Sequence, residues 1–216
     1  WVVNTAHIFL LTLSFNKKIC AVIYNPAKIP NTSLGPPLET NSFIYLGTLY
    51  EKRNPQLIID IFYDYYKENR PSKFYFIGDN RCTDIKIPEE IKENVIFHNW
   101  TDNPEEIIAR INTLVDIDSN IPGDVFMSSK LSQYLMYNRP ILCITHHNSP
   151  AENFTKSLTQ TVFCTCHIKK EILNGMRRAN MVVHNDEIYK ERTEVRQKLK
   201  GQNICIQLLK GLESII

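Results

Sequence analysis

Short apolar runs alternate with amphipathic segments along the chain from about residue 42 onward. Each run is followed by a glycine or a polar residue, and runs of this kind predict strands that are buried on both faces of a sheet. The predicted strands are residues 43–46, 73–77, 94–97, 113–118 and 141–145.

The segments between these runs carry apolar residues at helical spacing. In the first segment Pro55 occupies the first helical position, and the apolar face consists of Leu57, Ile58, Ile61, Phe62 and Tyr65. Further helices are predicted at 88–93, 101–111, 130–137, 167–178 and 186–200. This alternation predicts an α/β fold with a doubly wound, Rossmann-like parallel sheet. The loops that follow the strands of such a sheet share one rim, where ligands bind.

The two ends of the chain depart from this pattern. Residues 1–3 and 18–24 are candidate short strands. Residues 25–41 contain four prolines and one glycine in a polar setting, which predicts a linker with little regular structure. Residues 203–216 carry an apolar stripe at helical spacing, and such a stripe needs a partner surface.

Charge and cysteine content narrow the classes of function. The net charge is +2, from 25 basic and 23 acidic residues, so binding to nucleic acid by phosphate neutralisation is not expected. Six cysteines in 216 residues argue against a disulfide-rich secreted fold. The longest early apolar run, residues 8–13, is far shorter than the ~20 residues of a membrane-spanning helix.

No metal site is predicted. The sequence Cys164-Thr-Cys166-His167 lacks a second ligand pair at zinc spacing, so we interpret its thiols as structural. His146 and His147 leave a strand in opposite directions, which disfavours joint ligation of one ion.

The loop after the first strand carries residue types that bind anions. Gly47 allows a ligand to approach the backbone closely, and Lys52 and Arg53 stand just before a helix start. The alternative interpretation is a solvated basic turn.

A second candidate loop follows the fourth strand. Ser128, Ser129 and Lys130 offer hydroxyl groups, backbone N–H groups and a positive charge at a helix start, although serine there also suits a plain helix cap. Because a lysine in the first turn opposes the helix dipole, the binding role is favoured for Lys130. Three nearby carboxylates are interpreted as polar loop residues, since they show no calcium-loop spacing: Asp116, Asp118 and Asp124.

The remaining rim loops have ordinary interpretations beside the functional ones. Gly78-Asp79-Asn80-Arg81 fits a common turn. His98 is more often a structural histidine than a catalyst, and Trp100 more often a packing residue than a platform for a base.

Several stretches resemble, in order, the nucleotide-sugar-binding half of GT-B glycosyltransferases. FIYLGTLYEKRNPQLIIDIF looks like that family's strand, glycine, basic loop and helix, FYFIGDN like its second strand, and NVIFHNW like its third strand and loop. DVFMSSKLSQYLMYNRPIL looks like the signature of a retaining, bacterial, capsule- and lipopolysaccharide-type branch. The resemblance covers roughly residues 40–215.

This resemblance implies a donor, an acceptor and a set of site residues. The donor is a nucleoside diphosphate sugar, the acceptor is a glycan or lipid-linked molecule, and transfer needs neither a metal nor a cofactor. Six residues match positions around the donor diphosphate, namely Gly47, Thr48, Arg53, Ser128, Ser129 and Lys130. Four match positions around the base and ribose, namely His98, Asn99, Trp100 and Gln133. No catalytic residue is predicted.

The sequence departs from the family pattern at three positions. Thr48 stands where an arginine often follows the glycine, and Val125 and Gln133 stand where two glutamates are common. A neutral amide loses the charged bond to the ribose, worth roughly 1.5–3 kcal/mol against about 0.5–1.5 for a neutral bond. These departures imply weaker or altered donor binding.

The resemblance also implies a domain organisation. Residues 1–41 would be a remnant of the N-terminal domain with its linker, residues 42–200 the Rossmann-like donor-binding domain, and residues 201–216 a helix that packs on the N-terminal domain of the same enzyme. Such a fragment is expected to be inactive alone, and the enzyme to be cytoplasmic and peripheral to the inner membrane. A non-catalytic, GT-B-like partner-binding module and a nucleotide-sugar isomerase or epimerase are the alternatives.

Overall fold

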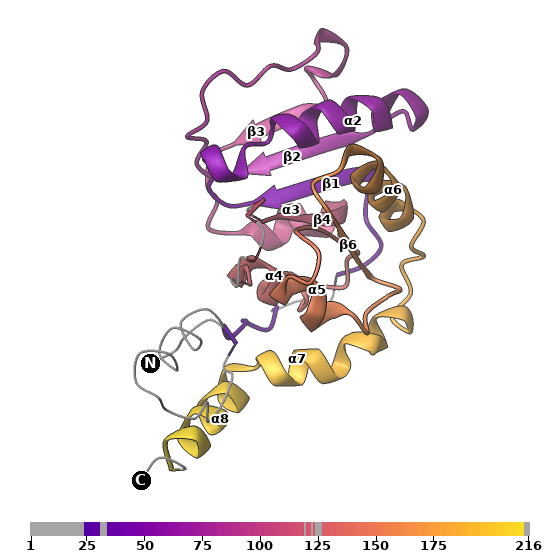
Figure 1. The fold of residues 1–216 in the computed structure, drawn as a ribbon. Coiled ribbons are helices and arrows are strands. Elements are labelled where there is room, and N and C mark those ends of the chain that lie inside the picture. The colour runs from indigo at the N-terminus through magenta and orange to yellow at the C-terminus, as the bar shows by residue number, and fades with distance from the viewer. Residues whose placement is uncertain (1–23, 31–33, 119, 122, 124–126, 214–216) are drawn as a thin grey trace.

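The fold is a layer of strands with helices packed on both of its faces (Figure 1). The computed structural model describes residues 24–30, 34–118, 120–121, 123 and 127–213. The candidate strands at 1–3 and 18–23 therefore lie outside the described residues.

Six strands form one sheet in the order β3-β2-β1-β4-β5-β6, and every neighbouring pair is parallel. The strands are β1 (Glu39–Leu46), β2 (Lys73–Ile77), β3 (Val95–His98), β4 (Ile111–Ile117), β5 (Ile141–Ile144) and β6 (Val162–Thr165). The order reverses between β1 and β4, so the predicted doubly wound sheet and its common rim are confirmed.

The helices cover the sheet between successive strands. They are α2 (Gln56–Glu68), α3 (Pro104–Arg110), α4 (Ser129–Tyr134), α5 (Pro150–Thr155), α6 (Lys169–Asn180), α7 (Thr193–Leu199) and α8 (Gly201–Glu213). Within the described residues, three short 3-10 turns accompany them, η1 (Glu51–Arg53), η2 (Glu89–Ile91) and η3 (Ile188–Arg192).

Several boundaries differ from the sequence prediction. β1 begins at Glu39, so the last three residues of the predicted linker belong to the sheet. The single helix predicted over 186–200 is divided into η3 and α7. Neither α5 nor β6 was predicted, because each has only a few residues and β6 is half polar.

Alternating side chains of the strands feed two separate cores. Phe43 and Tyr45 of β1 lie in the core under α2 and α6, whereas Ile44 and Leu46 lie in the core under α3, α4, α5 and α7. This period of two follows from the pleat of a strand. β1 is apolar over its second half because helices cover both faces of the sheet there. This burial also fixes the position at which its rim loop begins.

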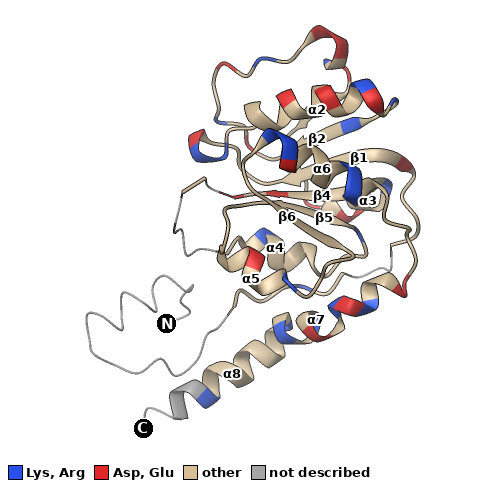
Figure 2. Cartoon of the chain, turned by 45° about the vertical axis from the view of Figure 1, so that its right-hand side comes forward, with Lys and Arg blue, Asp and Glu red and all other residues tan. Residues whose placement is uncertain are grey.

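The segment before β1 is fixed to the C-terminal helices. The backbone N–H of Ala27 donates to the carbonyl of Leu199 at 2.9 Å, and the side chain of Gln133 both accepts from and donates to the backbone of Lys28. α8 then runs away from the sheet (Figure 1) and carries few charges (Figure 2), with Ile206 and Leu209 exposed. No helix among the described residues is long and apolar enough to cross a membrane.

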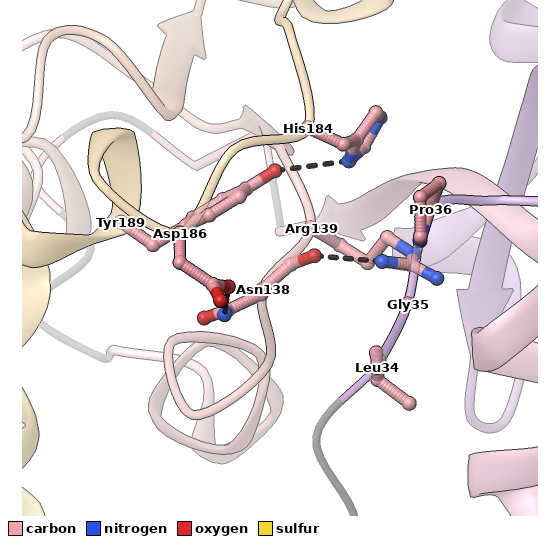
Figure 3. Close-up of a pocket in the computed structure, with 8 residues that line it drawn as sticks. All are labelled: Leu34, Gly35, Pro36, Asn138, Arg139, His184, Asp186 and Tyr189. Carbon is pink, nitrogen blue, oxygen red and sulfur yellow. Dashed lines mark hydrogen bonds between the residues drawn. The ribbon is translucent and has the colours of Figure 1, made fainter.

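A cavity of about 250 Å³ lies beside the amino ends of the strands, on the far side of the sheet from the rim at their carboxyl ends (Figure 3). Its lining includes Arg139, His184 and Tyr189. The His184 ring contacts the Tyr189 hydroxyl through Nδ1 at 3.2 Å and the Asn112 side chain through Nε2. Burial lowers the pKa of His184 to about 4, and the nearby charge of Arg139 acts in the same direction.

His184 is expected to make the fold sensitive to acid. The folded-state pKa lies below the ordinary value of 6.5, so between these values the unfolded chain binds a proton that the folded chain does not. The free energy of unfolding therefore falls as the pH drops from about 6.5 to about 4, by about 3 kcal/mol from this group. Urea unfolding at both pH values measures the loss, which should be smaller in His184→Gln. The exposed His98→Gln variant is the control, and an equal loss in all three proteins would contradict the assignment.

Candidate functional site

The candidate site lies at the reversal of strand order, where the carboxyl ends of β1 and β4 meet. The loop after β1 starts at Gly47, and the loop after β4 starts at Asp118. In doubly wound sheets, ligands bind outside the carboxyl ends of the strands at a reversal of this kind.

Two glycines bring the backbones of neighbouring rim loops into contact. The N–H of Gly47 donates to the carbonyl of Ile77 at 2.8 Å, and the N–H of Gly78 donates to the carbonyl of His98 at 2.9 Å. Both glycines have positive φ, +139° at Gly47 and +132° at Gly78. A Cβ atom on Gly78 would lie 2.6 Å from the Gly47 carbonyl oxygen, so this arrangement requires glycine.

Lys130 from the start of α4 lies directly over Gly47. A Cβ atom at residue 47 would be 2.6 Å from Cε of Lys130 and 3.4 Å from its Nζ. The Nζ atom also lies 5.2 Å from the centre of the Tyr45 ring, within cation–π range. The ammonium group is thus held at the end of β1, beside the backbone that a ligand could approach.

Ser128 and Asp116 anchor the start of α4 to the sheet. The Ser128 hydroxyl donates to Oδ1 of Asp116 at 3.1 Å and accepts from the backbone N–H of Lys130 at 3.2 Å. Asp116 is fully buried inside β4, so its interpretation as a polar loop residue is wrong. Its Oδ2 atom has no hydrogen-bond partner among the described residues.

Arg53 reaches the same place from the η1 turn. Its Nη2 atom lies 3.7 Å from Oδ1 of Asp118, and its guanidinium carbon lies 5.5 Å from the centre of the Tyr50 ring. The Nε atom of Arg53 is buried and has no partner among the described residues. Arg53 and Lys130 therefore stand with two carboxylates around one point of the rim.

Burial and charge pull the pKa values of this group in opposite directions. Burial raises the pKa of Asp116 against the opposing effects of Lys130, Arg53 and the Ser128 hydrogen bond. Burial lowers the pKa of Lys130, and Asp116 opposes that shift while Arg53 adds to it. Burial also acts to lower the pKa of Arg53, but Tyr45, Tyr50 and the two aspartates together raise it. An anion placed beside both cations would favour their charged forms.

The other two predicted diphosphate residues are chain neighbours of this group, because Thr48 follows Gly47 and Ser129 precedes Lys130. Thr48 is half-buried, and its carbonyl accepts from the Tyr45 hydroxyl at 3.1 Å. Ser129 is exposed. α4 has only six residues, so its dipole adds little to the field here.

The four predicted base and ribose residues fall in two places. His98 is the last residue of β3, and Asn99 and Trp100 follow it. All three are exposed, with Trp100 60% accessible. The His98 carbonyl accepts from Gly78, so this loop adjoins the Gly78 loop. Gln133 lies on α4, and both ends of its amide bind the backbone of Lys28 at 3.0 and 2.9 Å.

Sequence reasoning did not find Tyr45 and Tyr134 as parts of this site. The Tyr134 hydroxyl is buried and accepts from the backbone N–H of Leu46 at 2.9 Å, which fixes the last residue of β1. Both tyrosines lie in segments predicted as a strand and a helix, 43–46 and 130–137, and nothing in those patterns distinguishes a hydroxyl that holds the rim. Val125 and Asp124, named in the sequence comparison, lie outside the described residues.

Comparison with solved structures shows a shared fold. A variant of TarM from S. aureus, in complex with Fondaparinux, alpha-GlcNAc-glycerol and UDP, matches 97% of this chain with a TM-score of 0.73 and 16% identity. HepE from Anabaena, in complex with UDP-glucose, matches 90% with a TM-score of 0.66 and 13% identity. The lipopolysaccharide outer core galactosyltransferase WaaB matches 91% with a TM-score of 0.64 and 16% identity. This chain has the fold of GT-B glycosyltransferases.

The match covers only part of each of these proteins. This chain corresponds to 43% of the TarM chain, 57% of the HepE chain and 56% of the WaaB chain. No family model matches the sequence, and no curated protein sequence does either.

Proposed function

We propose that this chain is the donor-binding half of a glycosyltransferase that moves a sugar from a nucleoside diphosphate sugar to a glycan or lipid-linked acceptor. The observation that carries the proposal is the convergence of Arg53 and Lys130 beside Gly47, at the reversal of strand order. In this reading the acceptor binds an N-terminal domain of the same enzyme, and the enzyme is a bacterial, cytoplasmic protein of polysaccharide biosynthesis at the inner membrane.

The two cations suit the diphosphate of the donor. In the free chain Arg53 lies beside Asp118, and Lys130 interacts with Asp116. A ligand with two or more negative charges would compete with Asp118 for Arg53 and would also interact favourably with the ammonium group of Lys130. As the sugar leaves, negative charge grows on the diphosphate, and fixed cations stabilise that charge. Since side chains supply the positive charge, this mechanism uses no bound metal and no cofactor.

The base and ribose are assigned to the neighbouring part of the rim. The exposed ring of Trp100, with His98 and Asn99, would contact the base. The loop that carries these residues adjoins the diphosphate loop through Gly78. A ribose contact from Gln133 requires its amide to leave the backbone of Lys28. That exchange would weaken donor binding in comparison with a glutamate that is free to accept ribose hydroxyls.

Calorimetric titration with a panel of nucleoside diphosphates and their sugars tests the proposal. UDP and UDP-glucose head the panel, because HepE holds UDP-glucose and TarM holds UDP. We expect saturable binding that weakens roughly 10- to 150-fold in Arg53→Ala and in Lys130→Met, the effect of losing one charged hydrogen bond. Methionine at residue 130 keeps the packing over Tyr45.

Lys52→Ala is the matched control, since Lys52 is exposed and adjoins Arg53 in the same turn. It should bind like the native chain. Absence of binding across the panel, or equal binding by the native chain and both site variants, would remove the donor site.

A non-catalytic partner-binding module is the second candidate. It is favoured by the occupied amide of Gln133 and by the exposed Ile206 and Leu209 of α8, a face suited to another protein. Tight association through α8 without nucleotide binding would select this function over the first.

A further inference from the structure

Three metal-binding side chains meet on the rim beyond β5 and β6, apart from the residues assigned to the donor. They are His147 in the loop after β5, Cys166 just after β6, and Glu171 in the first turn of α6. One ligand atom from each residue lies within 4.8 Å of the other two. The three residues come from two segments separated by 19 positions, as the numbering of His147 and Cys166 shows.

The sheet register places these segments side by side. Ile144 of β5 pairs with Thr165 of β6, and the backbone N–H of Thr145 donates to the carbonyl of Thr165 at 2.9 Å. The chain then leaves both strands at the same level, so the backbone N–H of His147 faces the Cys166 sulfur. The proximity of histidine and cysteine is therefore a property of the sheet.

The loop that carries His147 is held by the start of α5. Ser149 caps this helix by accepting from the N–H of Glu152 at 3.0 Å, and the Glu152 carboxylate accepts from the N–H of Asn148 at 2.6 Å. Ser149-Pro-Ala-Glu152 has the sequence of a capping box, but the Glu152 carboxylate binds the N–H of the residue before the cap, while the Ser149 N–H donates to the His146 carbonyl. The other Glu152 oxygen lies 3.8 Å from Nδ1 of His147.

The position of Glu152 leaves Nε2 of His147 for a metal. A ligating histidine usually turns its other ring nitrogen towards a carboxylate, which orients the ring and raises its basicity. The third group is also placed, because the Glu171 carboxylate accepts from the backbone N–H of Cys166 at 3.0 Å with one oxygen. These contacts hold the three side chains close to one another.

Sulfur, imidazole nitrogen and carboxylate oxygen are together the donor set of zinc. Zinc sites with three protein ligands keep a fourth position for water or another ligand. We propose that His147, Cys166 and Glu171 bind one Zn²⁺ ion, which ties the loop after β5 to the start of α6. This site goes beyond the proposed sugar transfer and plays no part in the charge stabilisation assigned to Arg53 and Lys130.

Binding requires the thiol to lose its proton. One Zn²⁺ enters, one proton leaves to the solvent, and a zinc–sulfur bond forms with no change in oxidation state. The expectation of no metal came from two local patterns, Cys164-Thr-Cys166-His167 and His146-His147, and neither could reveal that His147, Cys166 and Glu171 come together.

Cobalt titration of the metal-free chain tests the site without any nucleotide. We expect one equivalent of Co²⁺ to give a thiolate-to-cobalt absorption band in the near ultraviolet, and Zn²⁺ to remove that band by displacement. In Cys166→Ser the band should be absent. In His147→Gln and Glu171→Gln the affinity should fall by at least the roughly 10–100-fold typical of losing a second-shell partner.

Cys205→Ser and Cys82→Ser are the matched controls, because these cysteines lie on α8 and in the loop after β2. Both should keep the band and its 1:1 stoichiometry. Zn²⁺ should also raise the melting temperature of the native chain and of both controls, but not that of Cys166→Ser. A band that persists in Cys166→Ser, or a native chain that shows no saturable band, overturns the proposal.

Discussion

Replacement of Arg192 by alanine is expected to lower the free energy of unfolding by about 4 kcal/mol or more. Arg192 is fully buried and donates three hydrogen bonds of 2.8 Å, to the Thr161 hydroxyl, the Thr161 carbonyl and the Tyr137 carbonyl. Alanine would remove these three charge-assisted bonds, although each acceptor keeps one other partner: Glu191 for the Thr161 hydroxyl, the Ile141 N–H for the Thr161 carbonyl and Arg196 for the Tyr137 carbonyl. It would also open a void where the side chain was. Equilibrium unfolding in urea, followed by circular dichroism, measures the loss.

Two variants separate the causes of that loss. Arg192→Met restores much of the volume, so the remaining loss reports the hydrogen bonds. Arg177→Ala is the control, since Arg177 is only partly buried and pairs with Glu68 at the surface, a contact worth about 0–1 kcal/mol. A similar loss in Arg177→Ala and Arg192→Ala would show that burial of Arg192 does not stabilise the fold.

Gly78→Ala should lower the free energy of unfolding by about 3 kcal/mol and weaken nucleotide binding as well. The added Cβ would meet the Gly47 carbonyl oxygen at 2.6 Å, and φ at residue 78 is +132°, so crowding and backbone strain each contribute about 1–3 kcal/mol. Relief of the clash moves Gly47, which lies under Lys130. Urea unfolding and calorimetry on the same preparation measure the two effects.

Gly35→Ala provides the comparison for that variant. A Cβ there meets no atom within 4 Å, and φ lies outside the left-handed region. It should change stability by no more than about 0.5 kcal/mol. If Gly78→Ala were equally mild, the close contact between the two rim loops would not be a constraint on the site.

Local patterns in the sequence were sufficient to predict the strands β1 to β5 but not β6. β2 was predicted at its observed bounds because four apolar or aromatic residues in a row, preceded by Lys73, end just before Gly78. β6 was not predicted because it has only four residues, Val162–Thr165. Its last two, a cysteine and a threonine, are only partly buried. An edge strand has a neighbour on one side only, so its sequence is under weaker demand for apolar residues.

The candidate site was predictable where one loop supplies the signal. Gly47 and Arg53 belong to one short stretch, and Lys130 begins the helix after β4, so their residue types alone indicated an anion site. Asp116 and Tyr134 were not predictable because their roles arise from contacts across the sheet, to Ser128 and to Leu46. The contact between Gln133 and Lys28 joins residues 105 positions apart, which no local pattern can indicate.

The position of β1 in the middle of the sheet has a consequence for synthesis on the ribosome. β1, β2 and β3 are made first and can pair as soon as residue 98 has emerged, but the other edge of β1 then stays open. That edge is closed only when β4, at 111–117, has left the exit tunnel. Until then the nascent chain exposes an unpaired apolar strand, which is a template for misassembly. Lys130 follows β4 in the chain and reaches Gly47 only after that, so the candidate site forms once β4 has paired with β1.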